Sequence, residues 1–217
     1  MKKTTSAAAA LILGASTLFS AGSAMADVSY NIGYVSEYHF RGILQKNSSA
    51  SGGIDFEESG FYIGTWAADV GDGLEVDLYG GYGIETDAGL SASIGFTGYY
   101  YTGEFDDTYQ EINLNFGYQM VSLEYSFGNY DNFGGPELDY DFLALTIDPG
   151  NGFYGKYGTF GDDFDGDYFE FGYGTTVSDI DLGVSLIFAD EMLGDQLDAN
   201  GAADNAQSLV FSIGKSF

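Results

Sequence analysis

The sequence predicts an all-β fold: a transmembrane, antiparallel, up-and-down β-barrel of twelve strands that follows a cleaved signal peptide. Three observations predict it. Segment after segment of the 217-residue chain alternates apolar with polar residues. Most segments are about 9–11 residues long, the length at which a tilted strand crosses hydrocarbon. Aromatic residues make up 17% of the chain and glycine fills 33 positions, a composition typical of curved membrane sheets with aromatic girdles.

The N-terminus has the pattern of a secretory signal. Lys2 and Lys3 precede an apolar run at residues 7–18, which is shorter than the ~20 residues that a spanning helix needs. Ala24-Met25-Ala26 supplies a small-x-small cleavage site. We therefore expect a signal peptide at 1–26 and a barrel at 27–217, in the outer membrane of a Gram-negative bacterium, reached through the periplasm.

Six strands are expected in the N-terminal half, at 28–40, 52–57, 61–70, 74–85, 90–101 and around 111–116. Residues 61–70 are ambiguous, because the pair Phe61/Ile63 and the pair Tyr62/Trp66 compete for the apolar face. Alternation in the other segments puts these residues on the lipid side: Tyr30, Ile32, Tyr34, Tyr38, Phe40, Leu74, Val76, Leu78, Tyr82, Ile84, Leu90, Ile94, Phe96, Ile112, Leu114 and Phe116.

Six more strands are expected at 121–127, 140–148, 153–160, 168–177, 180–189 and 207–217. The clearest apolar faces among them are these: Val121, Leu123, Tyr125 and Phe127; Ile180, Leu182, Val184, Leu186 and Phe188; Leu209, Phe211, Ile213 and Phe217. A soluble β-sandwich or closed barrel is the alternative, but it would need a core for about a dozen long apolar strands.

The connections between these segments alternate in length. Short ones lie at 59–60, 85–89, 118–119, 148–152 and 178–179. Longer, acidic and glycine-rich ones lie at 41–49, 102–108, 128–138, 161–167 and 190–206, and 70–73 is the exception. Short turns at one rim and long loops at the other are typical of outer-membrane barrels.

The last segment, QSLVFSIGKSF, resembles the final strand of bacterial outer-membrane barrels. That resemblance implies that Phe217 is an assembly signal read by the barrel-assembly machinery. The partners that it implies are the lipid bilayer and the lipopolysaccharide of the outer membrane.

Charge and cysteine content exclude several classes of partner. The chain carries a net charge of −27, and −29 once residues 1–26 are removed, which excludes nucleic acid as a partner. No cysteine is present, so neither a disulfide nor a thiolate metal site is expected. We expect no cofactor.

A run of residues near the N-terminus resembles the TorF family, a group of uncharacterised proteobacterial outer-membrane proteins classed as porins. The likeness spans about residues 34–118 and rests on an aromatic-Arg-Gly run and a Ser-Gly-aromatic-Tyr-x-Gly-x-Trp run. The resemblance implies a channel, and it implies neither a catalytic residue nor a particular substrate. The motif residues are Phe40, Arg41, Gly42, Gly60, Phe61, Tyr62, Gly64 and Trp66.

Charged side chains on the polar faces are the candidate pore lining. Rings of acids favour cations, so the sequence predicts a narrow passive channel for small cationic or neutral solutes. Alternatively, these groups pair across the interior and plug it, in a non-conducting structural or adhesive barrel with acidic, divalent-cation-binding loops. Twelve strands do not decide between the two. The candidates are Glu37, His39, Arg41, Asp55, Glu75, Asp77, Glu85, Glu111, Glu124, Glu170 and Asp181.

Two more specific roles concern Arg41 and His39. Arg41 is expected to pair with inward acids such as Glu37 or Glu75, with a role in a constriction as the alternative. His39, Glu37 and Ser36 could suggest a hydrolase, but Ser36 falls on the opposite face of the strand, so no catalytic residue is expected.

The loop around residue 163 is rich in oxygen ligands and is a weak candidate for a divalent cation. Its carboxylates are Asp162, Asp163, Asp165 and Asp167. The twelfth position counted from Asp163 is Gly174, where a calcium loop of the EF-hand type needs a glutamate. A solvated acidic loop is the simpler interpretation.

Overall fold

A computed structural model describes residues 27–194, 196–197, 201 and 203–217. The predicted signal peptide at 1–26 lies outside the described residues. The elements are β1 (Asp27–Phe40), β2 (Ile43–Glu58), β3 (Phe61–Gly71), β4 (Gly73–Glu85), β5 (Leu90–Tyr101), β6 (Tyr109–Tyr118), β7 (Val121–Tyr130), a 3₁₀ turn η1 (Asn132–Gly134), β8 (Leu138–Ile147), β9 (Phe153–Asp162), β10 (Asp167–Val177), β11 (Ile180–Ala189), β12 (Gln196–Leu197), β13 (Ala203–Asp204) and β14 (Ala206–Ser216).

Twelve of the strands form one closed barrel, in the order β1-β14-β11-β10-β9-β8-β7-β6-β5-β4-β3-β2. All neighbours run antiparallel, and the ring closes where Asn31 to Val35 of β1 pair with β14. The predicted fold class is therefore confirmed. β12 and β13 form a small separate sheet in the β11–β14 connection. No described helix has the length and apolar character needed to cross a membrane.

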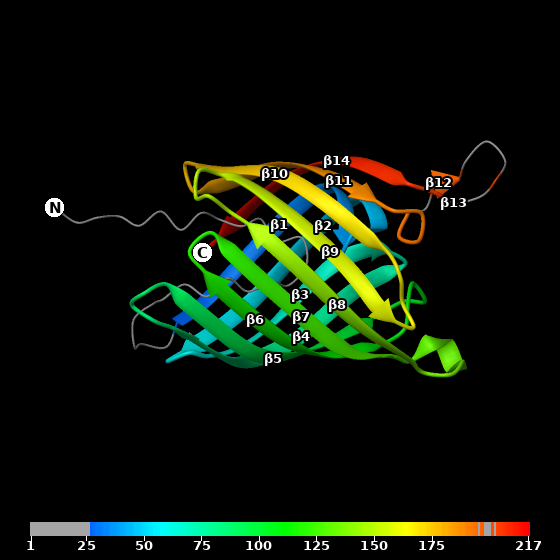
Figure 1. The fold of residues 1–217 in the computed structure, drawn as a ribbon, viewed down its shortest axis with the longest axis horizontal. Helices are drawn as coiled ribbons and strands as arrows, with labels where there is room; N and C mark the ends of the chain where they lie inside the picture. Colours follow the sequence, from blue (N-terminus) through cyan, green and yellow to red (C-terminus); the bar gives the residue numbers. More distant parts are fainter. Residues whose placement is uncertain (1–26, 195, 198–200, 202) are drawn as a thin grey trace.

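The two ends of the barrel differ, as Figure 1 shows. The start of β1 and residue 217 lie at one end, where Tyr30 and Phe217 exchange backbone hydrogen bonds. The short connections lie at this end too. The longer ones, including η1 and the β12–β13 segment, lie at the opposite end, called the loop end below.

Alternating burial confirms most predicted faces. On β4, Leu78 is 50% exposed while its neighbour Asp77 is 1% exposed. β3 resolves the sequence ambiguity, since Phe61 and Ile63 are about half exposed on the outer surface. Tyr62 and Trp66 are only 6% and 8% exposed and point into the barrel. The apolar residues thus form an outer belt, and the polar ones line the lumen.

The predicted connection at 41–49 is wrong. β2 begins at Ile43 rather than near residue 52, and a two-residue turn, Arg41-Gly42, joins it to β1. Both turn residues have positive φ, 48° and 88°, as a type I′ hairpin turn requires. The polar run QKNSS concealed the strand, because a strand without lipid on either side needs no apolar face.

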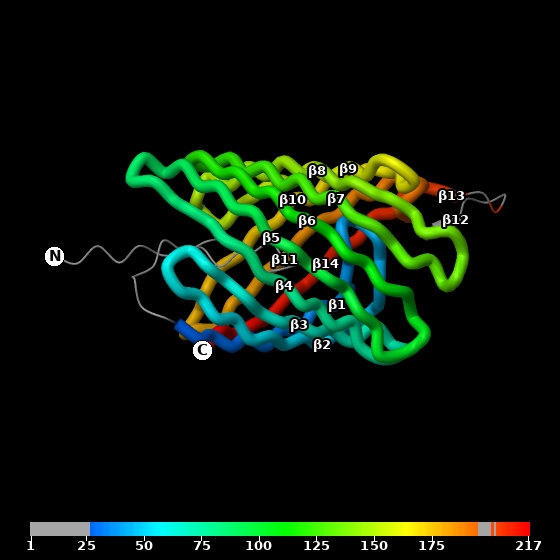
Figure 2. Tube along the Cα trace, turned by 90° about the horizontal axis from the view of Figure 1, so that it is seen from below, coloured from blue at the N-terminus to red at the C-terminus, as the bar shows by residue number. Residues whose placement is uncertain are grey.

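Residues 36–50 leave the barrel wall. Pairing of β1 with β14 ends at Val35 opposite Ser212, and pairing of β2 with β3 begins at Ser51 opposite Ala68. Between these points the described strands β1 and β2 pair only with each other. We call residues 36–50 the inward hairpin, because Figure 2 shows the blue tube of β1 and β2 turning from the wall into the barrel.

The departure from the wall overturns two predicted faces. Tyr38 and Phe40 were expected on the lipid side, yet Tyr38 is 2% exposed and lies inside the barrel. The ring of Phe40 packs edge-on against the buried Tyr99, 5.3 Å away. A register shift between Tyr38 and His39 accompanies the change. Such a bulge bends the strand and re-aims nearby side chains.

Candidate functional site

The tip of the inward hairpin crosses the lumen to the far wall. Arg41 donates to both carboxylate oxygens of Glu111 on β6, at 2.8 and 2.9 Å. The same guanidinium donates to Glu124 at 3.0 Å and to Ser126 at 3.1 Å, both on β7. It also lies over the ring of Phe142 on β8, 4.3 Å from the centroid. Because β6 to β8 lie across the ring from β1, only an inward hairpin can reach them.

Glu111 is the hub of this network. Besides the two Arg41 contacts, its carboxylate accepts hydrogen bonds from Tyr99, Tyr140 and Asn113 at 2.8, 3.0 and 2.7 Å. The residue is 2% exposed. A buried carboxylate is stable only when it is paired and fully hydrogen-bonded, and Glu111 meets both conditions.

A second contact joins the hairpin to β3 and β4. The hydroxyl of Tyr38 donates to Glu75, which also accepts from Tyr101 at 3.1 Å. The Tyr38 ring packs at 5.7 Å from that of Trp66. Glu75 is 1% exposed. The hairpin therefore contacts β3 and β4 as well as β6 to β8, and it spans the lumen between them.

Apolar packing reinforces the closure. Phe142, Phe160, Tyr168 and Val210 belong to a buried cluster inside the barrel, against which Val35 and Ile43 pack. Gly42 lies against the Tyr168 ring so closely that a Cβ there would be 2.8 Å from Cγ. The tip needs glycine for this approach as well as for its positive φ.

Asp77 is the exception among these buried, hydrogen-bonded side chains. It is 1% exposed, and its Oδ1 has no hydrogen-bond partner in the described part of the chain. It lies on β4 beside Glu75. Burying such an oxygen without a hydrogen bond or a cation is costly.

The predicted pore-lining residues fall into three groups. Asp55, Glu75, Asp77, Glu111, Glu124 and Glu170 lie on the inner wall; Glu37, His39 and Arg41 lie on the hairpin; Asp181 and Glu85 lie near the short-turn end. Asp55 accepts from Tyr79, Glu170 from Tyr154 and Asp181 from Thr176.

Two details differ from the expected pairing. Arg41 binds Glu111 and Glu124 rather than Glu37 or Glu75. The inward hairpin carries Arg41 away from its own wall and across the lumen to β6 and β7. His39 bonds Glu37 at 3.1 Å, whereas the Ser36 hydroxyl accepts from the N–H of Phe211 on β14. The three residues do not converge.

Sequence reasoning missed Lys156 on β9. Its Nζ lies 3.8 Å from Glu124 and 5.9 Å from the centre of the Phe142 ring. Aromatic residues on both faces of β9 hid the alternation. The lysine itself was the available signal, since a lysine in mid-strand costs about 2–4 kcal/mol on the lipid face at the midplane and so belongs inside.

Four of the eight motif residues from the sequence resemblance lie in the hairpin or against it. Phe40, Arg41 and Gly42 form its tip, and Trp66 packs on its Tyr38. Gly64 lies beneath the ring of Tyr79, where a Cβ would be 2.6 Å from Cε2. Tyr62 points inward, Phe61 outward, and Gly60 occupies the β2–β3 turn with φ 88°.

The acidic loop after β9 shows no ion-binding arrangement. Over the described residues, no group of three or more His, Asp or Glu side chains could hold one metal ion. Asp163 accepts from the N–H of Asp139, and Asp165 accepts from Gly166, so these carboxylates satisfy local backbone groups.

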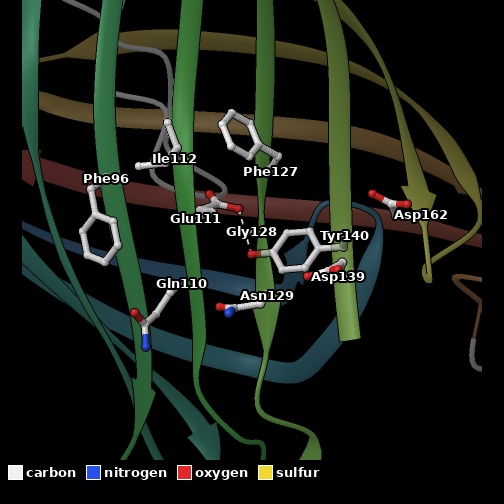
Figure 3. Close-up of a pocket in the computed structure, with 10 residues that line it drawn as sticks. All are labelled: Phe96, Gln110, Glu111, Ile112, Phe127, Gly128, Asn129, Asp139, Tyr140 and Asp162. Carbon is white, nitrogen blue, oxygen red and sulfur yellow. Dashed lines mark hydrogen bonds between the residues drawn. The ribbon is translucent and has the colours of Figure 1, made fainter. Parts of the chain in front are cut away.

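A hollow on β5 to β9 lies in the wall rather than in the lumen. Its lining combines outward residues such as Phe96, Phe127 and Asn129 with the inward Glu111 and Tyr140. Figure 3 shows the hydrogen bond between Glu111 and Tyr140, with Phe96 on β5 and Phe127 on β7.

Comparison with known proteins identifies the family. A family model described as "Bacterial protein of unknown function (Gcw_chp)" matches residues 20–217. The chain belongs to this family. No curated protein matches the Gcw_chp chain.

Among solved structures, the NanC porin is similar over 88% of this chain and 99% of its own, with a TM-score of 0.50 and 12% identity. OprD of Pseudomonas aeruginosa is similar with a TM-score of 0.42 and 11% identity, over 88% of this chain and 66% of its own. At such identity the NanC match shows a shared porin-like barrel fold.

Proposed function

We propose that this Gcw_chp chain is an outer-membrane porin, a narrow channel for passive diffusion of small cationic or neutral solutes. The observation that carries the proposal is the charge of the inner wall. Six of the predicted acids line it, namely Asp55, Glu75, Asp77, Glu111, Glu124 and Glu170. Among the described wall and hairpin residues, Arg41 and Lys156 neutralise the acids on β6 and β7.

Asp55, Glu75 and Asp77, on β2 and β4, have no ion-pair partner among the described residues. Asp55 and Glu75 accept hydrogen bonds from neutral tyrosines, and Asp77 has an unpaired oxygen. Because a ring of carboxylates attracts cations and repels anions, the β2–β4 side forms the cation path. The NanC fold, named as a porin, supports the channel class.

The closed lumen favours a second candidate, a non-conducting barrel. Tyr38, Arg41, Glu75, Asp77 and Glu111 are all 8% exposed or less, so the hairpin fills the interior at their level. In this candidate the hairpin is a permanent plug and the acidic loops bind partners outside.

Planar-bilayer recording separates the two. Protein shown to be folded by heat-modifiable gel migration should give conductance steps, and its reversal potential in a KCl gradient should indicate preference for K⁺. Folded protein that gives no steps under any applied voltage would establish the non-conducting candidate. Steps with anion preference would contradict the acid-wall argument.

Surroundings and partners belong to the same proposal. The outer apolar belt is suited to lipid, so the bilayer and its lipopolysaccharide are the expected contacts. We propose Phe217 as the residue read by the assembly machinery, since its side chain is 65% exposed. Export through a signal peptide at 1–26 is proposed with it.

A further inference from the structure

We infer that the inward hairpin has a second position, straightened into the wall between β14 and β3, and that it switches between the two positions as the gate of the channel. The position seen in the structure is the closed one. The gating role rests on the proposed channel function, whereas the movement itself does not.

The barrel wall, as far as the structure describes it, has two unpaired strand edges beside the hairpin, one on β14 and one on β3. Within the described residues, β14 has no strand beside it on the β1 side before Ser212, and β3 has none on the β2 side beyond Ala68. On each edge, a serine hydroxyl of the hairpin bonds a backbone group that a neighbouring strand would otherwise pair. Ser36 accepts from the N–H of Phe211 at 2.9 Å, and Ser49 donates to the carbonyl of Asp69 at 2.7 Å.

Open strand edges are costly near lipid. Because an exposed edge of a barrel has no water to satisfy it in hydrocarbon, natural barrels close their edges with neighbouring strands. If the observed register of β1 with β14 continues, Ser36 lies opposite Phe211 and His39 opposite Ser208. In the wall position, strand pairing would therefore satisfy the backbone groups that serine hydroxyls bond in the closed position.

The alternation in β1 fits the second position better than the first. Tyr30, Ile32 and Tyr34 face outward and are each about half exposed. In the continued register Tyr38 lies opposite Leu209, which also faces outward and is 47% exposed. In the structure, by contrast, Tyr38 faces inward. The alternation of β1 thus favours the wall position, whereas its observed contacts favour the inward one. We therefore treat the hairpin as an element with two states.

Little of the wall has to break for the hairpin to move. Residues 31–35 stay paired with β14 and residues 51–58 with β3, so the barrel remains closed below the hairpin. The base of the hairpin on β2 is a run of small residues, Ser48-Ser49-Ala50-Ser51-Gly52-Gly53, and Ser48 already has φ 68°. The contacts that must break are side-chain contacts.

The closed position is held at its tip. Arg41 is the latch, because it joins the hairpin to Glu111 and Glu124 at once. When the hairpin leaves, water can hydrate these carboxylates, so they do not oppose opening as bare charges would.

Two disulfide locks test the switch, since the chain has no cysteine of its own. The inward lock is G42C/Y168C: a Cβ on Gly42 would lie 3.0 Å from the Tyr168 Cβ, and the substitution removes the clashing ring. Disulfides place the two Cβ atoms about 3.5–4.5 Å apart, so a small shift suffices. Gly42 has φ 88°, so G42C alone is the control for strain in the turn.

The wall lock is H39C/S208C. Residues opposite each other in an antiparallel pair have Cα atoms about 4.5–5.5 Å apart, within disulfide range. In the closed position His39 instead bonds Glu37 and the carbonyl of Gly42. The single variants H39C, S208C and Y168C complete the controls, and every recording is repeated after reduction.

Both disulfides should form in folded, membrane-inserted protein. The oxidised inward lock should lose conductance and regain it on reduction, and the oxidised wall lock should stay open longer than its reduced form. A wall lock that never oxidises, or an inward lock that conducts equally in both redox states, overturns the gate. If both locks oxidise but no form conducts, the movement stands while the channel and the gating role fall.

Discussion

Arg41 and Glu111 are 70 residues apart in sequence and form a two-point ion pair across the lumen, at 2.8 and 2.9 Å. Both side chains are almost fully removed from solvent. A buried pair adds little net stability over an apolar replacement, yet removing one partner strands a charge and costs about 3–5 kcal/mol. The pair therefore specifies the position of the hairpin more than it stabilises the barrel.

Replacing Arg41 should release the hairpin. R41Q removes the ion pairs with Glu111 and Glu124 that exist only in the closed position, so the H39C/S208C disulfide should form at least about tenfold faster in this background. K46Q is the matched control, because it removes one positive charge from the same hairpin but breaks only the half-exposed pair with Asp69. Equal acceleration by both variants would mean that hairpin charge, and not the latch, controls the movement.

Ion selectivity should depend on the unpaired wall acid. D77N removes the carboxylate whose oxygen lacks a partner, and it should lower the K⁺ to Cl⁻ permeability ratio without unfolding the barrel. D139N removes an exposed acid on the outer face near the loop end and should leave the ratio unchanged. Reversal potentials in a KCl gradient measure both, and an equal loss in the two variants would point to general surface charge.

Trp66 is the single tryptophan and reports the lumen directly. Because it is 8% exposed and packed on Tyr38, brominated lipids should not quench its fluorescence, and acrylamide should quench it weakly. R41Q should increase acrylamide quenching by withdrawing Tyr38. Strong quenching by brominated lipid would place Trp66 on the membrane side and reverse the assignment of β3.

Charge on the outer belt should destabilise the barrel. Ile94 is 56% exposed on β5, so I94R should cost up to about 2–4 kcal/mol if the residue sits at the bilayer midplane. Its neighbour Ser93 faces the lumen, where S93R can reach water. Denaturant unfolding in lipid vesicles compares the two, and equal loss would argue against lipid on the outer face.

Assembly should depend on the terminal aromatic residue. F217A should reduce the fraction of barrel assembled in cells while leaving refolding in detergent unchanged, because the side chain is 65% exposed. F211A, also exposed and on the same outer face of β14, is the control. If F217A also fails to refold alone, its role is structural.

The faces of the strands were predictable where alternation was uninterrupted. Ile180 to Ala189 and Ala206 to Ser216 lie as the sequence predicts, because lipid on one side and a polar lumen on the other impose a period of two. The acids on the inner wall follow from the same rule, including Glu75, Asp77 and Glu170.

The inward hairpin could not be predicted by that rule. Tyr38 packs against Trp66 and Ile43 packs against the buried cluster around Phe142, and these partners lie many residues away in sequence. Arg41 was placed among inward acids correctly, but its partners depend on how far the turn reaches. Lys156 was the one missed residue that a charge-burial argument alone would have found.

The joint between Asn31–Val35 and Ser212–Ser216 unites segments from opposite ends of the barrel sequence. Pairings of such long sequence separation form slowly, because the loop entropy is lost before any contact repays it. During biogenesis this joint should be the final one to form. Until then β1 and β14 are unpaired edge strands of the nascent sheet. An intermediate stalled at this stage would be the species most prone to aggregate or to be degraded.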